Sequence, residues 1–323
     1  SWEDKTFRVG VSIGLVPLGP ESGNVDDVLR AADAACYAAK DQGRNRIHLY
    51  TDDDEVLAAR EGAMHWVVRL QQAIEEDRLC LFSQAIVPLD PTSHDDQHHE
   101  LLVRMRDHDG NLILPGQFLP AAERYNLMGR LDRWVVQHAL DALSHVPTSI
   151  QAEITCAINL SGQSLCDDGF LDFVIAELQR SGVAGQRIVF EITETAAISN
   201  LARATQFMEA LRTLGCRFSL DDFGTGLSSF GYLKTLPVDF LKIDGMFVRD
   251  ILEDPIDLAM VRSINEIGHV MGKLTIAEFV ETDAVRSRLA QLGVDYVQGY
   301  AVGHPQPFAD AIPQAVAQVR SAH

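Results

Sequence analysis

The chain has 323 residues with 27 basic and 46 acidic side chains, which gives a formal net charge of −19 at pH 7. A hydrophobic content of 46% is enough for a large core and excludes a wholly disordered chain. The acidic balance argues against a partner such as DNA or RNA, because sequence-independent binding of a polynucleotide needs Lys and Arg to displace counterions. An anionic small ligand is still allowed, since metal cations can supply positive charge locally.

The sequence has no run of about 18 uncharged apolar residues, so it predicts no membrane span within this segment. Residues 1–5 lack the hydrophobic region of a signal peptide. The five cysteines are far apart, odd in number and without a Cys-x-x-Cys pair. These features predict reduced thiols and a cytoplasmic location, either for the whole protein or for the cytoplasmic part of a larger signalling protein.

Residues 1–50 differ in pattern from the rest of the chain. An alternating β-like run at 7–16 is followed by a loop and by helical periodicity over 25–41, with Gly43 as the helix stop. One strand pair and one helix bury too little surface to be stable alone. The segment is therefore expected to be the end of a domain that begins upstream, or to pack on its neighbour.

Residues 51–77 predict a connecting helix. Apolar side chains recur at helical spacing from Val56 to Ile74, which indicates one apolar face. The acidic run 52–55 is interpreted as the cap and first turn of this helix rather than as an ion site. The helix is expected to lead into the second domain at 78–323.

From residue 79 onward, short apolar runs alternate with helical patterns. Several of the helical patterns stop at a glycine, as expected for crossover helices between parallel strands. Eight such strands over about 250 residues predict an α/β fold, a TIM-like (β/α)8 barrel. The runs are at residues 81–89, 101–105, 156–160, 188–192, 218–220, 240–243, 274–277 and 296–297.

One connection is too short for a crossover helix. Only ten residues, nearly all polar, lie between Leu89 and Glu100, whereas a parallel connection needs about a dozen or more. The first strand is therefore predicted to be antiparallel to the others. The same stretch contains His94, His98 and His99, which we interpret as part of a solvated hairpin loop rather than as a metal-binding tract, because their spacing matches no zinc motif.

Acidic, amide and basic side chains stand at or near the ends of these runs. In a parallel barrel the carboxyl ends of the strands share one face, and that face hosts active sites. Burying several unpaired carboxylates together is costly, so the set needs a compensating cation. Hard oxygen ligands suit Mg²⁺ or Mn²⁺ better than Zn²⁺. The side chains are Glu100, Asn159, Glu191, Asp221, Asp222, Lys242, Glu278 and Gln298.

The adjacent acids Asp221 and Asp222 are the most informative of these. Successive strand residues point to opposite faces, so both reach the barrel mouth only where the strand bends away. The glycine-containing stretch 223–229 can supply that bend. Adjacent aspartates there can bridge two metal ions, an arrangement that cleaves phosphodiesters. A single strand-end acid is more simply a cap or a salt bridge, but the whole set at one barrel end favours function.

Seven motifs follow one another between residues 61 and 315. They are Glu100-Leu-Leu-Val-Arg104, Ile158-Asn159-Leu-Ser, Glu191-Ile-Thr-Glu194, Leu220-Asp-Asp-Phe-Gly-Thr-Gly, Leu241-Lys-Ile-Asp244, Ala277-Glu-Phe-Val-Glu281 and Val297-Gln-Gly-Tyr300. In this order they resemble the EAL-domain phosphodiesterases, which hydrolyse the bacterial second messenger cyclic di-GMP. The family fold is a barrel with an antiparallel first strand, in agreement with the loop-length argument.

The resemblance implies a two-ion metal site. Glu100, Asn159, Glu191 and Asp221 are implied as the ligands of one ion. Asp221 would bridge to a second ion, which Asp222 also holds. Either Glu278 or Gln298 would complete the second site through water.

The resemblance also implies roles in catalysis and substrate binding. Lys242 is similar to the lysine that touches or deprotonates the attacking water, and Glu278 is the competing general base. Glu194 resembles the residue that holds the loop after Asp222 in its competent shape. The implied contacts to the dinucleotide are Gln84, Arg104 and Gln298.

The implied reaction is hydrolysis of cyclic di-GMP to linear 5′-pGpG by a water that two metal ions activate, and a homodimer through the barrel is expected. The alternative is a cyclic di-GMP receptor that binds without hydrolysis. Three departures from the family pattern bear on packing and substrate fit. Leu101 replaces the alanine of Glu-Ala-Leu, Ala85 replaces a proline, and Phe279 replaces a glycine beside the candidate base. None removes an implied ligand, which favours the enzyme.

Residues 9–47 resemble the end of a GGDEF diguanylate cyclase domain, so 1–50 is expected to be the C-terminal remnant of such a domain. The Gly-Gly-Asp-Glu-Phe signature is absent from this sequence. Cyclase activity is therefore not expected of this chain.

Overall fold

The computed structural model describes residues 11–19, 47–49, 55–90, 97–151, 153–224 and 231–311, and a few positions between 25 and 36. The chain divides into two units, Ser1–Gln71 and Gln72–His323. In the first unit, β1 (Ile13–Leu15) pairs in parallel with β2 (Ile47–Leu49). Helix α2 (Glu55–Glu75) begins in the first unit and ends in the second. The expected helix cap at 52–54 lies outside the described residues.

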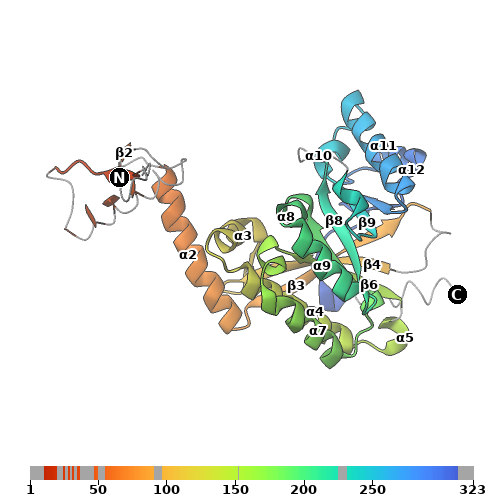
Figure 1. Ribbon diagram of the computed structural model, residues 1–323, viewed down its shortest axis with the longest axis horizontal. Coiled ribbons are helices and arrows are strands. Elements are labelled where there is room, and N and C mark those ends of the chain that lie inside the picture. The colour runs from red at the N-terminus through yellow and green to blue at the C-terminus, as the bar shows by residue number, and fades with distance from the viewer. Residues whose placement is uncertain are drawn as a thin grey trace, which may run out of the picture. The chain divides into compact units, whose positions relative to one another are not determined.

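The second unit is a closed barrel of eight described strands, which confirms the predicted fold class. The barrel closes because β3 is hydrogen-bonded to both β4 and β11. Helices lie around these strands (Figure 1). The barrel strands are β3 (Leu79–Pro88), β4 (Gln97–Arg106), β6 (Ile154–Leu160), β7 (Ile188–Thr193), β8 (Arg217–Phe223), β9 (Phe240–Ile243), β10 (Leu274–Ala277) and β11 (Tyr296–Val297).

Strand β3 is antiparallel to both of its barrel neighbours, as the short connection to β4 predicts. The other neighbouring pairs of barrel strands, from β4 to β11, are parallel. Two short strands pair with barrel strands without belonging to the barrel, and they were not predicted. β5 (Leu112–Ile113) pairs with β4, and β12 (Gln306–Pro307) pairs with β3.

The longer helices connect the strands, and four of the six begin at residues that capping chemistry favours. Asp167, Asn200, Asp254 and Thr282 each accept a backbone N–H in the first turn of a helix. Helix α7 ends at Gly182, whose φ of 69° suits glycine. The helices are α3 (Pro115–Arg124), α4 (Met128–Ser144), α7 (Asp168–Ser181), α9 (Leu201–Arg212), α11 (Pro255–Val270) and α12 (Asp283–Leu292).

Several one-turn helices stand in the connections. They are α5 (Thr148–Gln151), α6 (Gly162–Leu165), η1 (Gly185–Arg187), α8 (Glu194–Ser199), η2 (Tyr232–Lys234) and α10 (Gly245–Val248). Two of them matter for the site, since α8 begins at Glu194 and α10 follows the last residues of β9.

The interpretation of His98 and His99 as loop residues is wrong. Both belong to β4 and are buried, with exposed fractions of 5% and 8%. The His98 ring stacks on Tyr296 at a centroid distance of 5.2 Å and meets the edge of Phe240 at 5.7 Å. These rings fill the barrel below the site, so the polar pattern of the stretch misled the sequence argument. His94 lies outside the described residues.

Among the described residues, no helix combines the length and the apolar character needed to cross a bilayer.

Candidate active site

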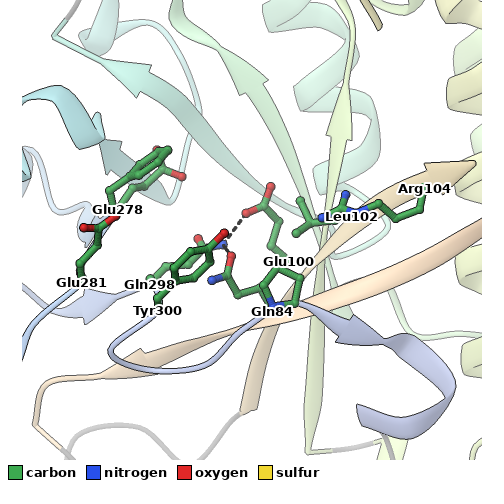
Figure 2. A pocket seen from close by; sticks show the side chains of 11 residues that line it. Gln84, Glu100, Leu102, Arg104, Glu278, Glu281, Gln298 and Tyr300 are labelled. Atoms are coloured by element: carbon green, nitrogen blue, oxygen red, sulfur yellow. Dashed lines mark hydrogen bonds between the residues drawn. The ribbon is translucent and has the colours of Figure 1, made fainter. Parts of the chain in front are cut away.

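A cavity of about 390 Å³ opens at the barrel end where the parallel strands terminate. Figure 2 shows Glu278 and Glu281 on one side, Glu100 and Arg104 on the other, and Gln298 between them. Each of the eight described barrel strands, or the residue directly after it, contributes a predicted site residue to this region. They are Gln84 of β3, Glu100 of β4, Asn159 of β6, Glu191 of β7, Asp221 of β8, Lys242 of β9, Glu278 after β10 and Gln298 after β11.

The ammonium group of Lys242 is the centre of the site. This side chain is fully buried, and its Nζ lies 2.8 Å from Glu278 Oε1 and 2.9 Å from Glu191 Oε2. Asp221 Oδ1 is 3.3 Å away and Glu100 Oε2 is 3.4 Å away. One cation therefore contacts carboxylates from four strands or strand ends.

A chain of amides holds the Glu100 carboxylate from its other side. Asn159 Nδ2 donates to Glu100 Oε1 at 2.7 Å, and Gln298 Nε2 donates to Glu100 Oε2 at 2.6 Å. Gln298 Nε2 also lies 3.2 Å from Gln84 Oε1, and Gln84 Nε2 donates to the carbonyl of Gly303 at 2.9 Å. The predicted substrate contacts Gln84 and Gln298 are thus joined to the predicted metal ligands.

Asp221, Asp222 and Glu278 form a compact acidic group, with one carboxylate oxygen from each within 4.8 Å of the others. The bend that brings the two aspartates together lies at Asp222 itself, where φ is 54°. The register between β8 and β9 shifts at the same place. The stretch 225–230, to which the sequence assigned part of this bend, lies outside the described residues.

Burial and crowding shift the ionisation of these acids. Burial raises the pKa of Glu191 well above its ordinary value, despite the attraction of Lys242. Burial likewise raises the pKa of Glu278 to about 8, and burial together with Asp221 raises the pKa of Asp222 to about 6. For Glu100 the burial cost is exceeded by Lys242 and the amide donors, which lower its pKa.

Lys242 shows the reverse balance. Burial opposes its charge, but Asp221, Glu100 and the other two carboxylates raise its pKa well above the ordinary value. Five acids surround this single ammonium group, counting Asp222, so the described part of the site has an excess of negative charge. This excess adds to burial, which is the main reason why the pKa values of Glu191, Asp222 and Glu278 are raised.

The donor set fits hard divalent cations. Glu191 Oε1 is buried and has no hydrogen-bond partner among the described residues, so a strong acceptor is left unsatisfied. The neighbouring ligand atoms are carboxylate and amide oxygens, the type that Mg²⁺ and Mn²⁺ prefer. A cation would satisfy both the unpaired oxygen and the charge excess.

Glu194 holds the backbone that follows the aspartate pair. Its Oε2 accepts a hydrogen bond from the Gly224 N–H at 3.0 Å, and its Oε1 accepts one from the Tyr232 hydroxyl. These two residues stand on either side of 225–230. Glu194 therefore fixes both ends of the segment that follows the aspartate pair.

Arg104 lines the cavity, and its positive charge interacts with the carboxylate of Glu100. Its Nη1 donates to the carbonyl of Val103 at 2.9 Å, and its guanidinium lies 5.6 Å from the Phe82 ring centroid. Burial lowers its pKa from the usual arginine value. This position leaves the guanidinium at the side of the cavity, away from Lys242.

Three further residues at the site were missed by sequence reasoning. Asp244 raises the pKa of Asp222 and also caps α10. It directly follows β9, so the criterion of an acid at a strand end would have found it. Glu281 and Tyr300 line the cavity within motifs that were recognised, but no pattern in the sequence indicates which of their side chains face inward.

The fold and site define an α/β-barrel protein. At the carboxyl ends of its strands lies a cluster of acidic side chains that could hold a metal ion. The family model for the EAL domain matches residues 67–305. The chain therefore belongs to the EAL domain family.

Similar proteins agree with this assignment. The chain is 42% identical over 308 residues to the cyclic di-GMP phosphodiesterase PdeB of Shewanella oneidensis, covering 95% of this chain and 36% of that protein. It is 33% identical over 302 residues to the bifunctional diguanylate cyclase/cyclic di-GMP phosphodiesterase MucR of Pseudomonas aeruginosa, covering 93% and 43%. The chain thus spans less than half the length of these two relatives. The structure of the MucR phosphodiesterase in complex with cyclic di-GMP matches with 33% identity and a TM-score of 0.71, covering 76% of this chain and 99% of that one.

Proposed function

We propose that this chain is a phosphodiesterase that hydrolyses cyclic di-GMP to linear 5′-pGpG with two Mg²⁺ or Mn²⁺ ions. The observation that carries the proposal is the cluster around Lys242. One ammonium group contacts four carboxylates, a fifth at Asp222 feels its charge, and a buried Glu191 oxygen has no partner among the described residues. The names of the relatives and the ligand of the MucR structure support the choice of substrate.

The same residues would hold the two ions. One ion would be held by Glu100, Asn159, Glu191 and Asp221, and the second by Asp221 and Asp222 with Glu278 nearby. When bound, such ions activate water and neutralise charge on phosphoryl oxygens. The amide chain through Asn159 and Gln298 would keep the Glu100 carboxylate oriented toward this place.

The reaction adds one water to a phosphorus of the cyclic dinucleotide. The water oxygen forms a new P–O bond, the bond from phosphorus to the 3′-oxygen breaks, and the leaving oxygen takes up a proton. Glu278 and Lys242, which are 2.8 Å apart, are the two groups placed to hold or move that proton. Gln84, Arg104 and Gln298 line the cavity and would contact the dinucleotide.

The receptor without hydrolysis is the less supported function. A receptor needs no full set of ion ligands, whereas the sequence keeps every implied ligand, and the grouping of Asp221, Asp222 and Glu278 supports the enzyme. Binding of cyclic di-GMP without turnover would reverse this preference.

The proposal extends to three features outside the site. Residues 1–50 would be the remnant of a GGDEF domain, which the cyclase named in MucR and its match over 93% of this chain support. All five cysteines are free thiols, which suits the reducing cytoplasm. Dimerisation through the barrel is part of the proposal and is tested by the mass of the protein in solution.

The function is tested with the purified chain and cyclic di-GMP, in Mg²⁺ or Mn²⁺ and again in excess chelator. We expect linear pGpG with either ion and no product in chelator. The Glu100→Ala variant should form no product while keeping the folded barrel, which circular dichroism checks. Product formation that persists in chelator would contradict the metal requirement, and an inactive but binding wild type would favour the receptor.

A further inference from the structure

Phe279 occupies a backbone conformation that side chains rarely adopt. Its φ is 53°, a left-handed value at which a residue with a Cβ is strained and glycine is not. Its neighbours fix it there, since the Glu278 N–H donates to the carbonyl of Ile243 and the Val280 N–H donates to the carbonyl of Gln298. Glu278 is thereby directed to Lys242, while Val280 is fully buried.

The Phe279 ring lies in the wall of the substrate cavity, and 49% of the residue is exposed. The ring contacts two residues of α10 and its end, Gly245 at the start of the helix and Arg249 at the C-cap. It packs so closely on Gly245 that a Cβ there would overlap it, and the Arg249 guanidinium lies 4.5 Å from its centroid. The ring is therefore held in place while part of its surface still faces the cavity.

The composition of the cavity gives this ring a chemical purpose. Six of the ten other wall residues carry a carboxylate, an amide or a guanidinium group, and Tyr300 supplies a second aromatic side chain. The polar groups suit the sugar–phosphate part of a dinucleotide when cations offset the carboxylates. A purine base needs a flat apolar surface, and a fixed aromatic ring provides one at little cost in side-chain entropy. We propose that Phe279 stacks on one guanine of the cyclic dinucleotide and thereby sets substrate affinity. This inference rests on the proposed function.

The competing explanation is that the ring only fills space over Gly245. A space-filling role would not leave half of a large apolar residue exposed, and it would not explain strain at a position where glycine fits without strain. Strained backbone that persists beside a ligand cavity points to a binding role.

The test compares substitutions that separate the ring from the backbone. Phe279→Leu keeps the Cβ and removes the aromatic ring, Phe279→Tyr keeps the ring, and Phe279→Gly removes both the ring and the strain. Phe173→Leu is the matched control, because Phe173 on α7 also has an arginine over its ring, Arg133 at 5.6 Å, but does not line the cavity. Each variant is assayed for kcat and KM with cyclic di-GMP. Binding to metal-free protein in chelator is measured by calorimetry.

We expect Phe279→Leu and Phe279→Gly to raise KM and Kd about tenfold, a change that corresponds to about 1.4 kcal/mol and lies within the range of base–aromatic stacking. The kcat should stay within about twofold, because the ring carries no group that binds a metal ion or transfers a proton. Phe279→Tyr and Phe173→Leu should retain the wild-type values. Weaker substrate binding by the Phe279→Gly variant would also show that removing the backbone strain does not compensate for the loss of the ring.

Two results would overturn the inference while leaving the proposed function intact. One is an active wild type whose KM and Kd are unchanged in Phe279→Leu. The other is tighter binding in Phe279→Gly, which would make the ring an obstruction. A wild type that neither binds nor hydrolyses cyclic di-GMP would instead overturn the proposed function itself.

Discussion

Lys242 Nζ lies 2.9 Å from Glu191 Oε2, and both side chains are buried in the barrel. The other oxygen of this carboxylate has no hydrogen-bond partner among the described residues. Lys242 and a metal ion would therefore share the same carboxylates. This relationship makes the stability of the metal-free protein depend on a residue of the proposed active site.

Lys242→Met should destabilise the metal-free protein by about 3–5 kcal/mol, because removing one partner of a buried ion pair leaves the other uncompensated. Mg²⁺ or Mn²⁺ should raise the melting temperature of this variant more than that of the wild type, since a ligand that binds the folded state stabilises it. Thermal unfolding with and without metal measures both effects.

Lys273→Met is the control for that experiment. Lys273 is also buried, but its Nζ donates to the carbonyl of Val238 at 2.8 Å and lies away from the acidic cluster. It should lose stability without an enhanced response to metal. An equal metal response in the two variants would contradict the shared use of the carboxylates.

Asp221→Asn should abolish the rise in melting temperature that Mn²⁺ produces and lower kcat more than about a hundredfold. Changing a residue that only supports a metal ligand typically lowers metal affinity or activity by roughly 10- to 100-fold. Changing a ligand itself should lower kcat by more than this. Asp172→Asn, at an exposed aspartate of α7, should change neither quantity. Activity that survives in Asp221→Asn would argue against the two-ion site.

Tyr232→Phe should lower kcat roughly tenfold with little change in KM. The hydroxyl of Tyr232 donates to Glu194, and a hydrogen bond to a charged group contributes about 1.5–3 kcal/mol. Glu194 positions the backbone at Gly224 and not the substrate. Losing the hydrogen bond from Tyr232 to Glu194 should therefore impair turnover more than substrate binding. Steady-state kinetics measure the two parameters. A rise in KM at unchanged kcat would place Tyr232 in substrate binding instead.

Asp132→Asn should show a pH-dependent change in stability. Asp132 is buried, and its Oδ2 accepts hydrogen bonds from the Ser161 N–H and from the hydroxyls of Ser161 and Ser164. Burial raises its pKa, so the folded state favours the protonated acid. This contribution to stability is fully present below the unfolded pKa of about 4 and is lost as pH rises through the raised pKa of the folded state. The variant should therefore gain on the wild type as pH rises above about 4 in chemical unfolding.

Asp167→Asn provides a control of opposite sign. Hydrogen bonds from Arg133 and from the Gly169 N–H lower the pKa of Asp167, so its contribution is present above the unfolded pKa and lost as pH falls. This variant should lose ground to the wild type as pH rises. The same slope in both variants would show that the burial of Asp132 does not determine its effect.

The arrangement of the barrel could be predicted from the sequence because its strands are buried on both faces and read as short apolar runs. The reversed strand followed from a loop too short for a helix. The entry of His98 into β4 could not be predicted, because two histidines in a polar stretch resemble a loop. The His98 ring stacks on Tyr296, a residue nearly 200 positions away, and no local pattern encodes that contact.

The candidate site could be predicted as a set of residues but not as a network. The carboxyl ends of parallel strands share one face of the barrel, so acids at those ends can be assigned to that face without knowing which side chains they contact. The contact of Lys242 with Glu278, the amide chain to Gln84 and the support of Phe279 by Arg249 depend on side-chain packing across the barrel. No local pattern in the chain encodes such distances.

The reversed direction of β3 decides where the polypeptide joins the barrel. Leu79 pairs with Met105, near the carboxyl end of β4, so β3 starts at the barrel end that holds the cavity. The next pair joins Cys80 to Arg104, which lines the cavity. A first strand parallel to the rest would have put this junction at the opposite end. The chain therefore enters the barrel at the end that holds the cavity, and the second residue of β3 pairs with a residue of the cavity wall.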